Sequence, residues 1–377
     1  MEKYRNKDLP VEERVEDLLD RMTFEEKIDQ ITCLVTIADD IPEFENYIPN
    51  GIGNVGAFTV ADTVEPIVEY ADKLQKYLVN HTRLGIPALI HCEASAGAQF
   101  TEADVFPSAI AQASTFDTEV VGEMTDIIRK QMYYVGFRQA LSPVVDITRD
   151  PRWGRITETY GEDAALTSAM ASAFVKGIQG DELKEGVLAT AKHFAGHGIT
   201  EGGLNMGRNI VSERDMREIH CKPFQCAITE AGLKSVMNSY CSVNGEPVVG
   251  SKKMLTDILR GEMGFQGVYC IKEDGTLVLA RKDFEQPNGL CIAVAENFEE
   301  AGIRAIQAGL DVEYPRSKGF SYKMKESIES GRLSMDIIDQ AVRRVLTQKF
   351  ELGLFENPYP DLEKLKKYLH LKSADEL

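Results

Sequence analysis

Short apolar runs that end on polar residues alternate along this chain with longer amphipathic segments, and this alternation constrains the fold more than any other feature of the sequence. Buried strands of a parallel sheet are short and apolar, whereas surface helices repeat their apolar residues about every 3.6 positions. The clearest apolar runs are 85–93, 138–147, 186–194, 234–240 and 267–272. The pattern therefore predicts repeated β-α units around a parallel sheet.

The segments between the runs carry helix boundary signals. Four of them are amphipathic and end on a glycine, which closes helices because it adopts the left-handed backbone conformation. They are 119–136, 166–180, 212–232 and 299–309. A single TIM-type (β/α)8 barrel over residues 1–355 satisfies this alternation, with the regularity of its first strands left open. Residues 356–377 are interpreted as a short charged tail and not as a second domain.

The barrel prediction also places the functional groups. In TIM-type barrels the reacting side chains lie on the loops that follow the strands. The polar residues that end the five runs should therefore meet at one mouth of the barrel.

The charge balance narrows the class of ligand. The 377 residues include 60 acidic and 42 basic side chains, which gives a net charge of −18. This charge repels phosphate backbones and anionic membranes, so nucleic acid and membrane surfaces are excluded as partners, and neutral or cationic small molecules are favoured. The N-terminal residues have no apolar segment of the kind found in a secretory signal, and no later run is long enough to span a membrane. We expect a cytoplasmic protein.

The seven cysteines are scattered, odd in number and without a C-x-x-C pair. This usage indicates a reducing compartment in which most cysteines act as small buried apolar residues. Cys221 and Cys226 have the wrong spacing for a zinc knuckle. We therefore expect neither a metal nor a cofactor.

The stretch Ser142–Asp163, SPVVDITRDPRWGRITETYGED, passes from an apolar strand directly into a loop rich in Asp, Arg, Trp and Pro. Arg155 and the acids of this loop are spaced so that they can clamp one another and a polyhydroxylated ligand. A surface loop held by ion pairs remains the alternative. A second stretch, Lys192–Gly198 (KHFAGHG), places Lys and His at the end of a strand, where they supply hydrogen-bond donors for vicinal hydroxyls, followed by small residues that would let a ligand approach the backbone.

These two motifs occur together with four further segments, and the set closely resembles the catalytic barrel domain of glycoside hydrolase family 3, the β-glucosidase and β-xylosidase type. The further segments are 106–117, 235–248, 255–267 and 341–359. The resemblance extends from about the first helix to Tyr359, with the motifs in the order of the family. It implies a β-glycosidase that acts on the non-reducing terminal sugar of a small β-glucoside or β-xyloside.

The resemblance also implies roles for individual residues. Glu93, in GIPALIHCEASAG, matches the acid that holds the far hydroxyls of the sugar. Arg155, Lys192 and His193 match the positions that grip the other ring hydroxyls, and Tyr240 matches the tyrosine that hydrogen-bonds the nucleophile. A neutral sugar offers little charge, so many directed hydrogen bonds are needed to fix its pose.

The nucleophile position departs from the family. Retaining glycosidases use two carboxyl groups about 5 to 5.5 Å apart, one of which attacks the anomeric carbon. Aligned without gaps, the attacking aspartate of the family falls on Lys272, which cannot form a glycosyl ester. A one-residue bulge would bring Glu273 to the mouth, and a two-residue extension would bring Asp274. Both acids can instead be solvated turn residues.

Two further positions differ. Leu204 stands where many members have an arginine that contacts the sugar, and no internal histidine acid is visible, although His197 lies in the loop from which a proton donor could come. In two-domain members the acid/base glutamate comes from a following sandwich domain. We therefore expect a homo-oligomer or a partner chain that supplies the missing domain.

Two hypotheses follow. In the first, the chain is a cytoplasmic β-glycosidase in which Glu273 or Asp274 attacks the sugar. In the second, it is a catalytically impaired or partner-dependent sugar-binding barrel, because its nucleophile, its acid and one sugar-gripping arginine are altered. A third option, in which Lys272 or His193 acts as a base on a modified sugar, is neither supported nor excluded by the sequence.

Overall fold

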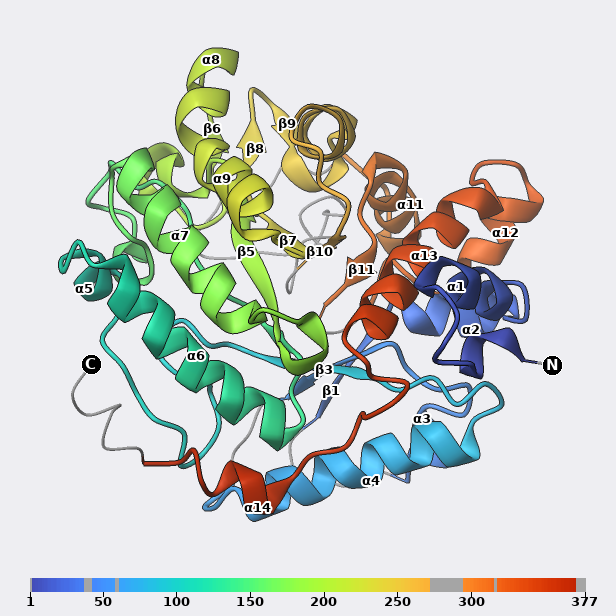
Figure 1. The fold of residues 1–377 in the computed structure, drawn as a ribbon. Coiled ribbons are helices and arrows are strands. Elements are labelled where there is room, and N and C mark those ends of the chain that lie inside the picture. The colour runs from blue at the N-terminus through green and yellow to red at the C-terminus, as the bar shows by residue number, and fades with distance from the viewer. Residues whose placement is uncertain (1, 37–42, 58–60, 272–293, 315–316, 371–377) are drawn as a thin grey trace.

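The computed structural model describes residues 2–36, 43–57, 61–271, 294–314 and 317–370, and its central feature is a barrel of eight parallel strands (Figure 1). The strands follow one another around the barrel in sequence order, and each pairs in parallel with the next. They are β1 (Cys33–Thr36), β2 (Asn54–Ala57), β3 (Leu89–Cys92), β4 (Gln139–Ala140), β5 (Leu188–Phe194), β7 (Ser235–Asn238), β10 (Val268–Ile271) and β11 (Val312–Glu313). The predicted TIM-type barrel is confirmed.

Among the described residues, one backbone hydrogen bond links the two ends of the strand series. The N–H of Glu313, in β11, donates to the carbonyl of Ile31, just before β1, at 3.2 Å. The ladder itself runs from β1 to β11 without pairing these two strands, so the barrel is nearly closed.

Helices surround the strands, and one or more of them follows each strand before the next begins (Figure 1). The main ones are α4 (Glu65–His81), α6 (Thr118–Val135), α7 (Ala164–Gln179), α9 (Lys222–Ala231), the π-helical η8 (Lys253–Glu262), α11 (Phe298–Ala308) and α13 (Met335–Glu351). Before β1 lie α1 (Val11–Leu19), which packs on α13, and α2 (Phe24–Gln30). Among the described residues, no helix is long and apolar enough to cross a membrane.

Shorter helical segments lie in the connections. They are η1 (Lys3–Arg5), α3 (Phe44–Tyr47), α5 (Ala109–Ala113), η2 (Ile156–Glu158), η3 (Leu183–Glu185), η4 (His197–Ile199), η5 (Glu201–Gly203), α8 (Glu213–Asp215), η6 (Met216–His220), η7 (Val248–Gly250), α12 (Met324–Glu329) and α14 (Leu362–Leu365). Between β1 and β2, the described residues form one helix, the four-residue α3.

Capping residues explain where several helices begin. Thr23 starts α2 with a capping box, in which its hydroxyl accepts from the backbone N–H of Glu26 and the Glu26 carboxylate accepts from the backbone N–H of Thr23. Asp117 caps α6 by accepting from two backbone N–H groups. The same helix ends at Gly136, whose φ of 95° lies in the left-handed region, as the sequence predicts.

The loops at the strand ends carry a small second sheet. Its strands are β6 (Arg208–Asn209), β8 (Ser242–Val243) and β9 (Glu246–Pro247), in the connections after β5 and β7. These strands fix the long loops after β5 and β7 to each other at the mouth of the barrel (Figure 1).

Candidate active site

The polar residues that end separate strands come together at the mouth of the barrel, and the first pair joins β3 to β5. Lys192 lies near the end of β5, and its Nζ is 2.5 Å from Oε2 of Glu93, the residue directly after β3. The lysine is 1% exposed, whereas the side chain of Glu93 is 19% exposed. The carboxylate therefore neutralises a buried ammonium while part of it remains open to solvent.

A second ion pair lies in the loop after β4. The guanidinium of Arg155 donates from Nε to Oε1 of Glu158 at 2.8 Å and from Nη2 to Oε2 at 2.7 Å. Burial alone would raise the pKa of Glu158, but the hydrogen bonds and charge of Arg155, with Lys192 nearby, hold that pKa below its ordinary value. Arg155 is thus bound to an acid of its own loop, as both the predicted clamp and the alternative of a loop held by ion pairs require.

The third pair is buried, with side chains that are at most 1% exposed. Nδ1 of His193 lies 2.8 Å from Oδ2 of Asp146, which also accepts from the backbone N–H of His193 at 3.3 Å. Burial raises the pKa of Asp146 to about 7, although the positive charge of Arg155 opposes the shift. The aspartate therefore fixes the orientation of the imidazole.

A register shift in the barrel helps to aim these groups. Lys192 pairs with Met237 of β7, whereas Phe194 pairs with Asn238, so the ladder is irregular between residues 192 and 194. Bulges of this kind redirect side chains and are frequent next to active sites.

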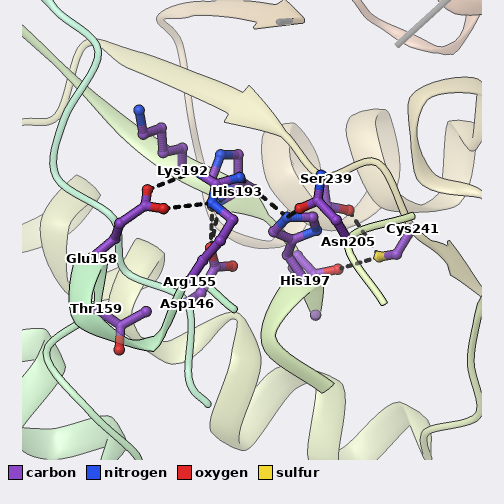
Figure 2. Close-up of polar contacts among 12 residues, drawn as sticks. Asp146, Arg155, Glu158, Thr159, Lys192, His193, His197, Asn205, Ser239 and Cys241 are labelled. Atoms are coloured by element: carbon purple, nitrogen blue, oxygen red, sulfur yellow. Dashed lines mark hydrogen bonds and ion pairs between the residues drawn. The ribbon is translucent and has the colours of Figure 1, made fainter. Parts of the chain in front are cut away.

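Aromatic rings complete the cluster. The ring of His197, in the loop after β5, lies 4.7 Å from the ring of His193 and 5.8 Å from the ring of Tyr240. Tyr240 follows β7 and is 9% exposed. Figure 2 shows Arg155 between Glu158 on one side and His197 on the other.

The structure contradicts the suggestion that His197 is a proton donor. The side chain is fully buried, and burial together with the charge of Arg155 lowers its pKa to about 3. An imidazole with this pKa is uncharged near neutral pH, and the N–H that it keeps is too weak an acid to protonate a leaving group.

The glycines of KHFAGHG also act differently from the prediction. A Cβ at Gly198 would lie 2.6 Å from the carbonyl oxygen of Ile147, in the loop after β4. The small residue therefore lets two loops of the protein pack together, and not a ligand against the backbone.

Of the predicted site residues, the cluster brings together Glu93, Arg155, Lys192, His193 and Tyr240; their roles toward a sugar stay predictions. Lys272, Glu273 and Asp274 lie outside the described residues. Sequence reasoning did not single out Asp146 or Glu158, although both lie inside the informative stretch 142–163.

Two further observations concern a hollow away from this cluster and possible metal ligands. A hollow of about 520 Å³ lies between α6 and the residues 357–368, and none of the cluster residues lines it. Within the described ranges, no three His, Cys, Asp or Glu side chains form a group that could hold a metal ion.

Comparisons with known proteins identify relatives over nearly the whole chain. The family model described as the N-terminal domain of glycosyl hydrolase family 3 matches residues 23–348. A putative β-xylosidase from Formosa agariphila is 32% identical over 98% of this chain and 50% of its own length. A probable β-glucosidase C from Aspergillus flavus is 34% identical over 96% of this chain and 61% of its own length.

Solved structures give the same picture. A β-glucosidase from Erythrobacter marinus superposes with a TM-score of 0.91 at 29% identity, over 99% of this chain and 49% of that chain. A β-glucosidase from Listeria innocua in complex with glucose gives a TM-score of 0.82 at 30% identity, over 96% and 50%. The chain thus spans about half the length of several of the relatives that it matches.

Proposed function

We propose, because this chain belongs to glycosyl hydrolase family 3, that its barrel binds the non-reducing terminal sugar of a small β-glucoside or β-xyloside and hydrolyses the glycosidic bond. Relatives over the chain's length are named β-xylosidase and β-glucosidase, which supports this class of substrate.

The observation that carries the proposal is the convergence of three polar pairs at the mouth. The pairs come from three different strands or the loops after them, and each combines a carboxyl group with a donor: Glu93 with Lys192, Glu158 with Arg155, and Asp146 with His193. A sugar hydroxyl both donates and accepts hydrogen bonds. A rim that carries the two ion pairs, Glu93 with Lys192 and Glu158 with Arg155, together with the buried Asp146–His193 pair can therefore satisfy several hydroxyls of one ring and fix its position.

Hydrolysis with retention needs two carboxyl functions beyond this rim. We propose that Glu273 or Asp274 attacks the anomeric carbon to form the glycosyl ester, and that Tyr240 lies beside the attacking group. The proton donor to the leaving group is proposed to come from a region beyond these residues, on a further domain or on a partner chain, since the matching relatives are about twice as long.

The test uses nitrophenyl β-glucoside and β-xyloside with the purified protein. We expect Glu273→Gln or Asp274→Asn, but not both, to lower kcat by at least about a thousandfold, because the ester can no longer form. The exposed Asp257, replaced by Asn, is the matched control and should keep full activity. Activity unchanged in both variants would remove the two nucleophile candidates, and sugar binding without any turnover of wild-type protein would favour the sugar-binding subunit.

The source of the proton donor can be tested through the leaving group. A nitrophenolate leaves without protonation, whereas an alkoxide does not. If the donor is absent from the chain, the protein should cleave nitrophenyl glycosides and barely cleave methyl glycosides. Equal rates on both would show that the donor is present.

We also propose that the protein works in a reducing compartment such as the cytoplasm. Six cysteines in the described ranges are free and buried, which supports this location. Some relatives are named periplasmic or lysosomal. Fractionation of the source cells, with detection of the chain in the periplasmic or lysosomal fraction, would contradict the proposal.

A further inference from the structure

We infer that Glu158 and His197 are positioning residues that hold the guanidinium of Arg155 from two sides and so present its remaining N–H groups to the sugar. The inference rests on the proposed function. It concerns two residues to which the sequence assigned no such role.

The hydrogen bonds of Arg155 leave a defined remainder. A guanidinium has five N–H groups and no acceptor. Two of them bind Glu158, and Nη1 lies 3.4 Å from Nε2 of His197. This arrangement leaves one N–H on each Nη atom without a partner among the described residues, and the side chain is 22% exposed. Two donors in one plane suit a pair of neighbouring hydroxyls.

His197 can lie beside the guanidinium of Arg155 because its ring is neutral. Protonation would place a second cation about 3.4 Å from the guanidinium, which is unfavourable in a buried site. The low pKa of His197, caused by burial and by Arg155, keeps the ring uncharged. Nε2 also lies 3.1 Å from Oδ1 of Asn205. A neutral ring protonated on Nε2 donates to Asn205, whereas a neutral ring protonated on Nδ1 accepts from Arg155, and the inference requires the second tautomer. The groups that face this ring include Arg155, Asn205, His193 and Tyr240.

The position of His197 is itself fixed by the two loops. The indole of Trp153, two residues before Arg155, meets the imidazole edge-on with ring centres 5.3 Å apart. The close packing of Gly198 on Ile147 holds the backbone beside His197 against the loop that carries Arg155. The imidazole therefore cannot move without moving the whole contact between the loops.

Substitutions separate positioning from packing. His197→Phe keeps the ring and removes the nitrogen, whereas His197→Gln keeps a polar atom that can reach the place of Nε2. We expect Glu158→Gln and His197→Phe to raise KM for a nitrophenyl β-glucoside by about tenfold or more with little change in kcat, because uniform binding is lost. His197→Gln should lie closer to wild type than His197→Phe. A purely structural role predicts the reverse order, since phenylalanine fills the buried site better.

An Arg155→Lys background tests whether the effects pass through Arg155. If they do, adding Glu158→Gln or His197→Phe to Arg155→Lys should change KM by less than about twofold. Independent tenfold effects in that background would overturn the inference. Glu201→Gln, which removes an exposed carboxylate paired with Arg208 in the loop after β5, is the control and should leave KM unchanged.

A crystal structure distinguishes this inference from the proposed function. If the wild-type protein neither cleaves nor binds sugars, the proposed function fails. The inference is then tested by the position of the Arg155 guanidinium in crystal structures of the variants. A guanidinium that turns or shifts in Glu158→Gln and His197→Phe supports positioning. A guanidinium that keeps its place in both variants overturns it.

Discussion

Each cation that the sequence assigned to the site has a carboxylate within hydrogen-bonding distance. Lys192 has Glu93, and Arg155 has Glu158. A sugar that binds here competes with these pairs for donors and acceptors, so its affinity depends on how well the pairs are already oriented and not on net charge. At the scale of residues, the affinity of the site for a sugar therefore depends mainly on how the neighbouring carboxylates orient Lys192 and Arg155.

His197 makes stability depend on pH in a predictable direction. Its pKa is about 3 in the folded protein, against an ordinary value of 6.5. Between these two pH values, the unfolded chain therefore binds a proton at this position and the folded protein does not. As pH falls below about 6.5, proton uptake by His197 in the unfolded chain therefore lowers the free energy of unfolding. Compared with His197→Gln, the wild type should lose about 2 to 3 kcal/mol more unfolding free energy between about pH 7.5 and pH 4.5.

Urea unfolding at both pH values measures this difference. The same substitution at exposed His81 is the control for loss of an imidazole as such. A pH-independent difference between wild type and His197→Gln would contradict the pKa shift.

Residue identities in the site could be predicted from the sequence, but their contacts only in part. Arg155 and Glu158 are three positions apart in one loop, so their pairing follows from local spacing. The pairing of Lys192 with Glu93 depends on how β5 and β3 are arranged across the barrel, which no local pattern contains. The neutral state of His197 depends on burial, and burial of a histidine in a polar motif is not visible in the sequence.

At the scale of elements, the five apolar runs located five of the eight barrel strands, β3, β4, β5, β7 and β10. The runs 186–194 and 267–272 contain β5 and β10. The strands β1, β2 and β11 were not picked out. Their length does not explain this, since the two-residue β4 lies inside one of the five runs. The barrel geometry, and not local propensity, makes them strands.

The contact between the loops after β4 and β5 predicts a strong effect of one methyl group. Gly198→Ala would place a Cβ 2.6 Å from the Ile147 carbonyl, so a loop must shift. We expect a loss of about 2 kcal/mol in unfolding free energy and a higher KM. Gly154→Ala, in the loop after β4, is the control, since its Cβ would meet nothing within 4 Å. Equal midpoints of urea unfolding for the two variants would contradict the expected strain.

A buried aspartate joins three elements at the last strands. Asp311, just before β11, accepts from Arg260 of η8 at 2.6 Å, from Arg344 of α13 at 2.8 Å and from the backbone N–H of Tyr269 at 2.8 Å. Asp311→Asn should destabilise the protein by about 3 kcal/mol, because two partly buried guanidinium groups lose their carboxylate.

Thermal and urea unfolding measure the effect of Asp311→Asn. Asp257→Asn, on the exposed side of η8, is the control and should change stability by less than about 0.5 kcal/mol. A similarly small change for Asp311→Asn would show that the guanidinium groups find other partners.

At the scale of the whole molecule, the C-terminal segment packs on the barrel, although the sequence suggested only a charged tail. The backbone N–H of Asp361 donates to the carbonyl of Tyr134 in α6, and the ring of Tyr368 stacks on that of Tyr134 with centres 5.3 Å apart. Leu365 is fully buried. The charged residues of this segment lie around a few apolar anchors that composition alone does not distinguish.

Substitutions in this segment test the packing. Leu365→Ala should lower the unfolding free energy by about 3 kcal/mol, because it leaves a cavity under α14. Lys367→Ala, two positions away and exposed, should change it by less than about 0.5 kcal/mol. Equal stability of the two variants in urea would show that the segment is not part of the cooperative fold.

The single backbone link between Glu313 and Ile31 has a consequence for synthesis of the protein. On the ribosome, β1 emerges early but gains its neighbour across the seam only after β11 has left the exit tunnel. Until then the growing chain displays unpaired strand edges, which attract other nascent chains and chaperones. A nascent chain stalled shortly before Val312 should therefore be an aggregation-prone and protease-sensitive intermediate.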